Sequence, residues 1–329
     1  MRPLNLDVSV QSAEMHQRRV KDQMEKLKIV FMGSPEIAVP ALKALAGKFD
    51  VVGVVTQPDR EAGRGKKIVQ PPVKTAALEL NIPVIQPERM KVPGTFEQLE
   101  AWAPDMIVVM AFGQILRKNV LELPKYGCLN AHASLLPRWR GASPIQAAIL
   151  HGDRVSGVTI MQMDPGIDTG PMLKSREIGI APDDTTVSLS EKMAELAAEL
   201  LLETIPGYVE GTIFPQPQPE EGACYTGMIS KQDGILDFTQ PAETLVWKIH
   251  AYNPWPCASF EIGREVFKVY QAHTAGNPDG LPAGTRTVCS GIPAIAAADG
   301  LLVLDELQAP GKKAMPGKAF LSGYRKWLL

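Results

Sequence analysis

Short apolar runs alternate with helix-length amphipathic stretches along the first two thirds of the chain. Uninterrupted apolar runs of this kind are typical of strands that are covered on both faces. Buried strands are expected at residues 28–32, 51–55, 105–110 and 157–163, with a partner strand at 172–178. Helices are expected after residue 33 and at residues 72–80, 144–150 and 185–205. This alternation predicts an α/β fold with a parallel, doubly wound, Rossmann-like sheet.

The starts of two predicted helices carry recognisable signals. Ser34 and Pro35 follow the first strand as an N-cap residue and a first-turn proline would, and Pro40 is expected to bend the helix. Asp183 or Asp184 is expected to cap the long helix that follows them.

The pattern changes at residues 213–228, where Pro215, Pro217 and Pro219 alternate with other residues. Alternating proline is stiff and extended, as in a linker. Beyond it, short apolar runs are separated by glycine and proline, which predicts a small β-barrel. Its strands are expected at residues 258–262, 265–271, 284–288 and 301–307, and its helices at 242–251 and 318–328.

These changes divide the chain into four parts. Residues 1–26 do not match a signal peptide, because they are charged and lack its apolar core. They are expected to be a disordered N-terminal extension, and a native extension or a start misassigned upstream of Met24 remain alternatives. Residues 27–212 form the expected α/β domain, residues 213–228 the linker, and residues 229–329 the C-terminal domain.

Composition excludes several classes of protein. The 34 basic and 36 acidic residues give a net charge of −2, so any site for a polyanion has to be a local patch. The four cysteines are far apart, which argues against a zinc site or a disulfide framework and fits a reducing cytosol. The chain has no apolar run of about eighteen residues, so no membrane span is expected.

Two glycine-containing segments were compared with nucleotide-binding fingerprints. Gly33 lacks the glycines that should follow it, and Gly63-Arg64-Gly65 has Ile68 where a third glycine belongs. Neither segment matches the dinucleotide motif, and the chain has no phosphate-binding loop of the G-x-x-x-x-G-K-[ST] type.

The densest cluster of candidate chemistry follows an apolar run at residues 126–129. If that strand continues, Asn130 and His132 lie on one face, because side chains alternate along a strand. A glycine- and proline-rich turn farther along the chain carries Asp164 and Asp168. An amide, an imidazole and a carboxylate together can stabilise an oxyanion, move a proton and orient the proton carrier. From these residues alone, two plainer interpretations remain possible: His132 is an ordinary histidine in a strand, and the segment with Asp164 and Asp168 is an ordinary turn.

The sequences of these two segments resemble those of the folate-dependent formyltransferases. The pattern Asn-x-His-x-Ser-Leu-Leu-Pro begins at Asn130, and Asp168 follows in the second segment. Further segments of the same resemblance lie at residues 29–35, 56–60, 63–67, 134–141 and 253–256.

Within that family the chain is most similar to the members that act on methionyl initiator tRNA. The resemblance implies a formyltransferase fold followed by an OB-like β-barrel that binds tRNA. It implies transfer from 10-formyltetrahydrofolate to the α-amino group of methionyl initiator tRNA, for translation initiation in the cytoplasm. Asn130, His132 and Asp168 are the implied catalytic residues, and no metal is expected. The enzyme is expected to be a monomer.

Two further groups of candidates follow from the same resemblance. For the folate, we expect a pocket lined by Ser134, Leu135, Leu136 and Pro137, walled by Phe112 and Gly113 at a strand end, and closed by the turn with Asp164. For the tRNA, we expect two basic patches formed by Arg60, Arg64, Lys66 and Lys67 and by Lys312 and Lys313. The plainer alternative is that both patches are solvated surface segments.

One departure and two rival functions qualify this hypothesis. Ile249-His250-Ala251 has histidine where the family usually has an arginine, which would weaken an RNA contact if that arginine makes one.

A formyltransferase acting on a nucleotide-sugar or ribonucleotide amine would share the catalytic trio but would not need the basic loop or the C-terminal barrel. A non-catalytic RNA-binding protein with an unused folate pocket is the other rival, and the intact trio argues against it.

Overall fold

The computed structural model describes residues 26–62 and 67–328, so residues 1–25 of the predicted N-terminal extension lie outside the described residues, as do Arg64 and Lys66. The described residues form two compact units. The first holds the residues up to Pro137, together with Gly157–Arg176 and Met193–Ala223. The second holds Arg138–Ser156, Glu177–Lys192 and the described residues from Cys224 onward. Each unit therefore draws on separate stretches of the chain.

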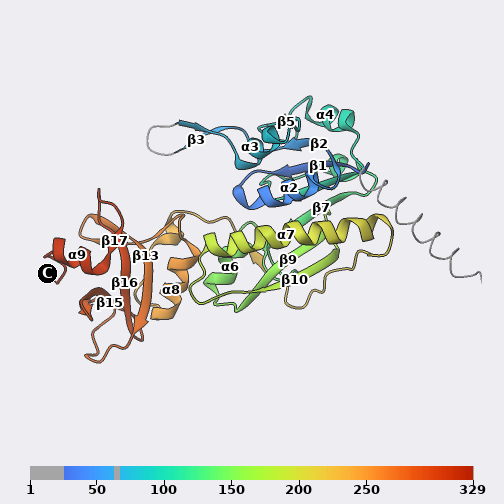
Figure 1. Ribbon diagram of the computed structural model, residues 1–329. Helices are drawn as coiled ribbons and strands as arrows, with labels where there is room; N and C mark the ends of the chain where they lie inside the picture. Colours follow the sequence, from blue (N-terminus) through green and yellow to red (C-terminus); the bar gives the residue numbers. More distant parts are fainter. Residues whose placement is uncertain (1–25, 63–66, 329) are drawn as a thin grey trace, which may run out of the picture. The chain divides into compact units, whose positions relative to one another are not determined.

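The larger sheet has seven strands in the order β10-β9-β7-β6-β1-β2-β5 (Figure 1). Its strands are β1 (Lys28–Gly33), β2 (Asp50–Val55), β5 (Val84–Ile85), β6 (Met106–Met110), β7 (Cys128–His132), β9 (Val155–Gln162) and β10 (Met172–Gly179). Neighbours from β5 to β7 run parallel, whereas β9 is antiparallel to β7. The predicted α/β fold is confirmed, and the sheet is mixed at the end that carries the second candidate segment.

Helices connect these strands. They are η1 (Glu36–Ala38), α2 (Val39–Ala46), α3 (Pro72–Glu79), α4 (Thr95–Trp102), α5 (Lys118–Leu121), α6 (Pro144–Leu150) and α7 (Thr186–Val209). Exposed ion pairs join α7 to β10: Arg176 Nη2 lies 2.6 Å from Glu203 Oε1, and Lys174 Nζ lies 2.7 Å from Glu203 Oε2. The hydrogen bond from Arg176, with that from Lys174, lowers the pKa of Glu203 to about 2.

Both predicted helix caps are wrong. The Ser34 hydroxyl accepts a hydrogen bond from the backbone N–H of Gln57 at 3.0 Å, which ties the turn after β1 to the turn after β2. Pro40 lies in the first turn of α2, where a proline fits without bending a helix. At the start of α7 it is Thr185 Oγ1 that accepts from the Ser188 N–H, at 3.4 Å.

Two short paired strands flank the predicted basic loop. Its strands β3 (Arg60–Ala62) and β4 (Lys67–Val69) pair antiparallel, with Arg60 opposite Val69. Sequence reasoning expected a pliable loop there because of the glycines, which lie among the residues that the structure does not describe.

The second unit contains an antiparallel sheet in the order β12-β13-β16-β15-β14, with β17 paired to β16. The strands are β12 (Ala258–Ile262), β13 (Glu265–Ala275), β14 (Arg286–Cys289), β15 (Ile292–Ala296), β16 (Leu301–Gln308) and β17 (Met315–Pro316), with α8 (Ala242–Ala251), η2 (Gln232–Gly234) and α9 (Gly317–Gly323). Sequence reasoning missed β15, because Pro293 stands inside it and proline argues against a central strand. The predicted last helix is also too long, since α9 ends at Gly323.

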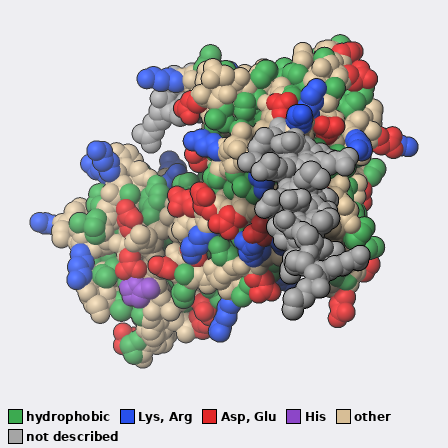
Figure 2. All heavy atoms as spheres, turned by 45° about the vertical axis from the view of Figure 1, so that its right-hand side comes forward, with side chains coloured by type: hydrophobic (Ala, Val, Ile, Leu, Met, Phe, Trp, Pro, Cys, Tyr) green, Lys and Arg blue, Asp and Glu red, His purple; other side chains and the backbone are tan. Residues whose placement is uncertain are grey.

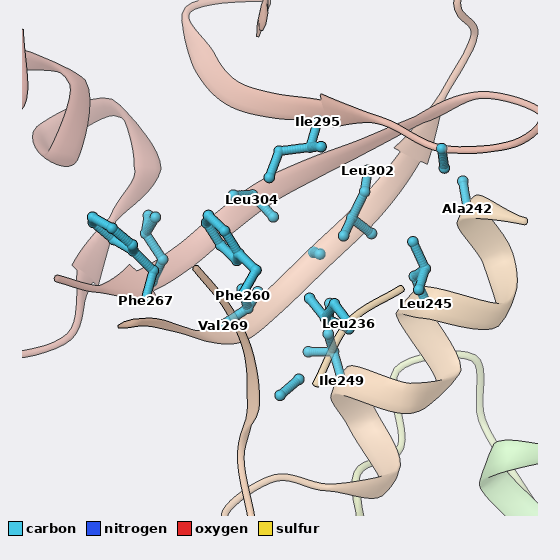
Figure 3. Close-up of a cluster of buried hydrophobic side chains, with 14 of the residues drawn as sticks. Leu236, Ala242, Leu245, Ile249, Phe260, Phe267, Val269, Ile295, Leu302 and Leu304 are labelled. Carbon is cyan, nitrogen blue, oxygen red and sulfur yellow. The ribbon is translucent and has the colours of Figure 1, made fainter. Parts of the chain in front are cut away.

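Apolar side chains from α8 and this sheet form the core of the second unit (Figure 3). Leu245 and Ile249 of α8 face Phe260, Val269 and Leu302 of the strands, and all are buried. Within the described residues, no helix is long and apolar enough to cross a membrane.

Candidate active site

The end of β7 carries the two side chains that the sequence singled out. Asn130 and His132 are both buried, with exposed fractions of 9% and 5%. They stand two residues apart on one strand, so they share a face of the sheet. The neighbouring parallel strand β6 places Val109 beside Asn130, and parallel strands bring their carboxyl ends to the same edge.

Asp168 reaches this pair from the turn between β9 and β10. Its Oδ1 accepts a hydrogen bond from Asn130 Nδ2 at 3.2 Å, and its Oδ2 lies 3.6 Å from His132 Nδ1. The structure therefore brings together the three residues that sequence analysis selected. One carboxylate contacts both the amide and the imidazole.

Bonds within the same turn fix its shape. The Asp164 carboxylate accepts from the Thr169 hydroxyl at 2.9 Å and from the Gly166 N–H at 3.0 Å. A Cβ at Gly170 would collide with the carbonyl oxygen of Gln162, so the return toward β10 requires glycine there. In this structure, Asp164 supports the turn that presents Asp168.

One hydroxyl on the neighbouring strand β9 holds the segment Ser134–Pro137. Thr159 Oγ1 donates to the carbonyl oxygen of Ser134 at 2.8 Å and accepts from the Leu136 N–H at 3.2 Å. Thr159 is fully buried and lies opposite His132 in the antiparallel pair. Sequence reasoning missed Thr159, because β9 is buried along most of its length and shows no two-residue alternation that would single out one hydroxyl.

The predicted wall of the folate pocket follows β6. Gln57 Nε2 donates to the carbonyl oxygen of Phe112 at 3.0 Å, and the Phe112 side chain is buried in an apolar cluster with Val109 and Leu116. Gly113 has a φ of +74°, a conformation that favours glycine. In the segment after β7, Leu136 is buried, whereas Leu135 and Pro137 are half-buried.

The structure assigns the predicted basic residues to different units. Arg60 and Lys67 belong to the first unit, where Arg60 Nη2 lies 3.3 Å from Glu88 Oε2 and both side chains are largely exposed. Lys312 and Lys313 are exposed residues of the second unit, in the turn between β16 and β17. On the face seen in Figure 2, basic and acidic side chains are interspersed, as expected for a nearly neutral chain.

Comparisons with known proteins identify the family of the chain. A family model described as formyl transferase matches residues 27–205, and one described as formyl transferase, C-terminal domain, matches residues 228–325. The chain therefore belongs to the formyltransferase family.

Within this family, the chain is similar to proteins named methionyl-tRNA formyltransferase. The chain is 47% identical to the methionyl-tRNA formyltransferase of Myxococcus xanthus over 304 residues, which cover 92% of this chain and 96% of that protein. It is 40% identical to the methionyl-tRNA formyltransferase of Geobacter sulfurreducens over 303 residues, covering 92% and 95%.

Two solved structures share the fold. The methionyl-tRNA formyltransferase from Clostridium thermocellum matches with a TM-score of 0.53 and 18% identity, covering 78% of this chain and 95% of that one. An N-formyltransferase from Helicobacter canadensis, in complex with folinic acid and dTDP-3-aminofucose, matches with a TM-score of 0.60 and 17% identity, covering 85% and 99%.

Proposed function

We propose that the chain transfers the formyl group of 10-formyltetrahydrofolate to the α-amino group of methionyl initiator tRNA, in the cytoplasm, for translation initiation. The observation that carries this proposal is the 47% identity to a methionyl-tRNA formyltransferase over 92% of the chain. The geometry of Asn130, His132 and Asp168 supplies the matching chemistry. The nucleotide-sugar rival rests on a neighbour with 17% identity, which shares the fold.

The reaction begins when the amine attacks the formyl carbon of the folate. The new C–N bond makes the carbon tetrahedral and places negative charge on the former carbonyl oxygen. The Asn130 amide carries two N–H groups, and one of them is directed to Asp168 at 3.2 Å. We assign the other to the developing oxyanion, where loss of one donor commonly costs about 3 kcal/mol.

His132 then handles the proton. Its Nδ1 lies 3.6 Å from Asp168 Oδ2, and we assign Nε2 to the reacting groups. The attacking amine loses a proton as the bond to N10 of the folate breaks and N10 gains one, so His132 can carry that proton between the two nitrogens. Asp168 orients the imidazole for this transfer. The formyl group passes directly from donor to acceptor, so the scheme needs no covalent enzyme intermediate and no metal.

Residues beside the trio supply the proposed folate pocket. The Ser134–Pro137 segment leaves β7 directly after His132, and Phe112 and Gly113 leave β6 at the same edge of the sheet. Open α/β sheets bind ligands at the carboxyl ends of their strands. Leu136 would contribute apolar surface, and the turn that contains Asp164 would close the pocket.

The tRNA is proposed to bind through local phosphate contacts. Arg60 and Lys67 belong to the patch that also includes Arg64 and Lys66, and Lys312 and Lys313 form the second patch. Because the net charge is −2, only a few contacts of this kind can supply the attraction to the tRNA backbone. A monomer that carries both patches is sufficient for this scheme.

Formyl transfer to charged tRNA tests the proposal. Labelled 10-formyltetrahydrofolate is incubated with the protein and methionyl initiator tRNA, with uncharged initiator tRNA and elongator methionyl-tRNA as controls. We expect label on the charged initiator tRNA above both controls. A protein that instead formylates an amino sugar nucleotide and leaves methionyl-tRNA unlabelled would establish the rival function.

A further inference from the structure

The proline-rich segment is bonded to the turn that carries Asp168. The backbone of Gln216 exchanges two hydrogen bonds with Met172, at 2.7 and 2.8 Å. Two residues later, the side-chain amide nitrogen of Gln218 donates to the carbonyl oxygens of Asp168, at 2.8 Å, and Gly170, at 2.7 Å. The proline-rich segment therefore contacts the first residue of β10 through its backbone and the turn through the Gln218 side chain.

The backbone of this turn needs such a support. Asp168 has a φ of +53°, in the left-handed region that glycine occupies freely, asparagine and aspartate sometimes, and other residues seldom. Such a conformation persists where the surroundings fix it. The side-chain amide nitrogen of Gln218 has two N–H groups, one for each of the two carbonyl oxygens. These carbonyls belong to Asp168 and Gly170, the residues on either side of Thr169.

We propose that Gln218 is a positioning residue for catalysis, acting through Asp168. By fixing the two carbonyls, Gln218 sets the direction in which the Asp168 carboxylate leaves the turn, toward Asn130 and His132. This role rests on the proposed formyl transfer, in which Asp168 orients His132. Catalytic groups displaced by about 1 Å can lose on the order of 100-fold in rate, so a contact this close to the backbone of Asp168 is well placed to matter.

Two substitutions separate the hydrogen bonds from the rest of the side chain. Gln218→Ala removes the amide, and Gln218→Glu keeps the shape but turns a donor into an acceptor facing two carbonyl oxygens. Gln216→Ala is the matched control, because it removes an exposed glutamine side chain from the same segment and leaves the backbone bonds to Met172. All three proteins are expected to melt close to the unaltered protein.

Steady-state kinetics with labelled 10-formyltetrahydrofolate and methionyl initiator tRNA give the first readout. We expect kcat to fall by about tenfold or more for both Gln218 variants, with KM values changed less than about threefold, as for a loss confined to the transition state. Gln216→Ala should match the unaltered enzyme in both kcat and KM.

A double substitution shows whether the effect passes through Asp168. In an Asp168→Ala background, Gln218→Ala should cause little further loss, since there is no carboxylate left to position. An equal loss with and without the Asp168 side chain would overturn the proposal, as would kinetics equal to those of Gln216→Ala.

Hydrogen exchange gives a readout that does not depend on activity. We expect the backbone amides of residues 163–171 to exchange faster in Gln218→Ala than in Gln216→Ala. Unchanged exchange would overturn the support by Gln218 even if the proposed function holds. If the unaltered protein fails to formylate methionyl-tRNA, the proposed function fails, and the exchange comparison still decides whether Gln218 holds the turn.

Discussion

Asn130 and Asp168, 38 positions apart in the sequence, share a hydrogen bond of 3.2 Å between the Asn130 amide and Asp168 Oδ1. The bond fixes which way the amide points, because its oxygen cannot face the carboxylate. Asn130 is therefore presented as a donor. The same carboxylate faces His132 through its other oxygen, so one side chain orients both partners.

Replacing Asn130 by alanine should lower kcat for formyl transfer by about 100- to 1000-fold, the usual effect of losing one oxyanion donor. Asn130→Asp should be no better, because a carboxylate beside Asp168 adds like charge and donates no hydrogen bond when ionised. Folate affinity, measured by titration, should change little in either variant. Near-normal turnover of Asn130→Ala would remove this residue from the mechanism.

Thr159→Val should weaken both the fold and the site. The change keeps the shape of the side chain but leaves the Leu136 N–H and the Ser134 carbonyl without their shared hydroxyl. A buried polar group that loses its partner commonly costs about 1–3 kcal/mol. We expect the free energy of unfolding to fall by that order in urea titrations, together with reduced folate affinity. Thr159→Ser keeps the hydroxyl and serves as the control; equal behaviour of the two variants would contradict this role.

Leu136→Asp should reduce folate affinity by at least about tenfold. Leu136 is 6% exposed, and an ionised carboxylate would be unfavourable in the apolar wall that it is proposed to form. Leu136→Met, which conserves volume, should retain affinity and the fold. A folded Leu136→Asp protein with unchanged folate affinity would place the pocket elsewhere.

Neutralising Lys312 and Lys313 should weaken tRNA binding and make it less sensitive to salt. Each lost phosphate contact should flatten the plot of log affinity against log salt concentration by about one unit. Folate affinity should not change. Lys43 and Lys118 are exposed lysines on α2 and α5 and provide a matched pair of control substitutions. A slope equal to that of the unaltered protein would exclude this patch from the tRNA interface.

His250 should make the protein less stable in mild acid. Its half-buried side chain has a lowered pKa because of desolvation, opposed by the charges of Asp183 and Asp184. The unfolded chain, with a histidine pKa of about 6.5, therefore takes up the proton first. The free energy of unfolding should decline as pH falls below about 6.5 and level off below the folded pKa. His250→Asn should lack this component in urea titrations at pH 7.5 and 5.5; an identical decline would contradict the assignment.

Most of the larger sheet could be predicted because its strands are buried apolar runs. β1 and β6 are buried along nearly their whole length, so their sequences contain almost no competing signal. The antiparallel direction of β9 was not predicted, because the residue pattern of a buried strand carries no mark of its direction. The short strands β8 (Arg140–Gly141) and β11 (Tyr225–Thr226) were also missed, since two residues give no measurable period.

The proximity of Asn130, His132 and Asp168 was predictable because the three residues lie in two short segments with distinctive sequences. Thr159 and Gln218 were missed for different reasons. Thr159 is one hydroxyl in an apolar strand, and its importance comes from the register opposite His132. Gln218 lies in a segment whose prolines indicate a linker, and neither its spacing nor its neighbours reveal which carbonyls it reaches.

The bonds made by Gln216 and Gln218 determine where the chain can be shortened. A truncated protein ending at residue 212 would include all seven strands of the larger sheet and the whole of α7. It would nevertheless lack both residues that hold the end of β10 and the Asp168 turn. Any isolated version of the first unit should therefore extend through Ala223, even though the last residues that it gains belong to no helix or strand.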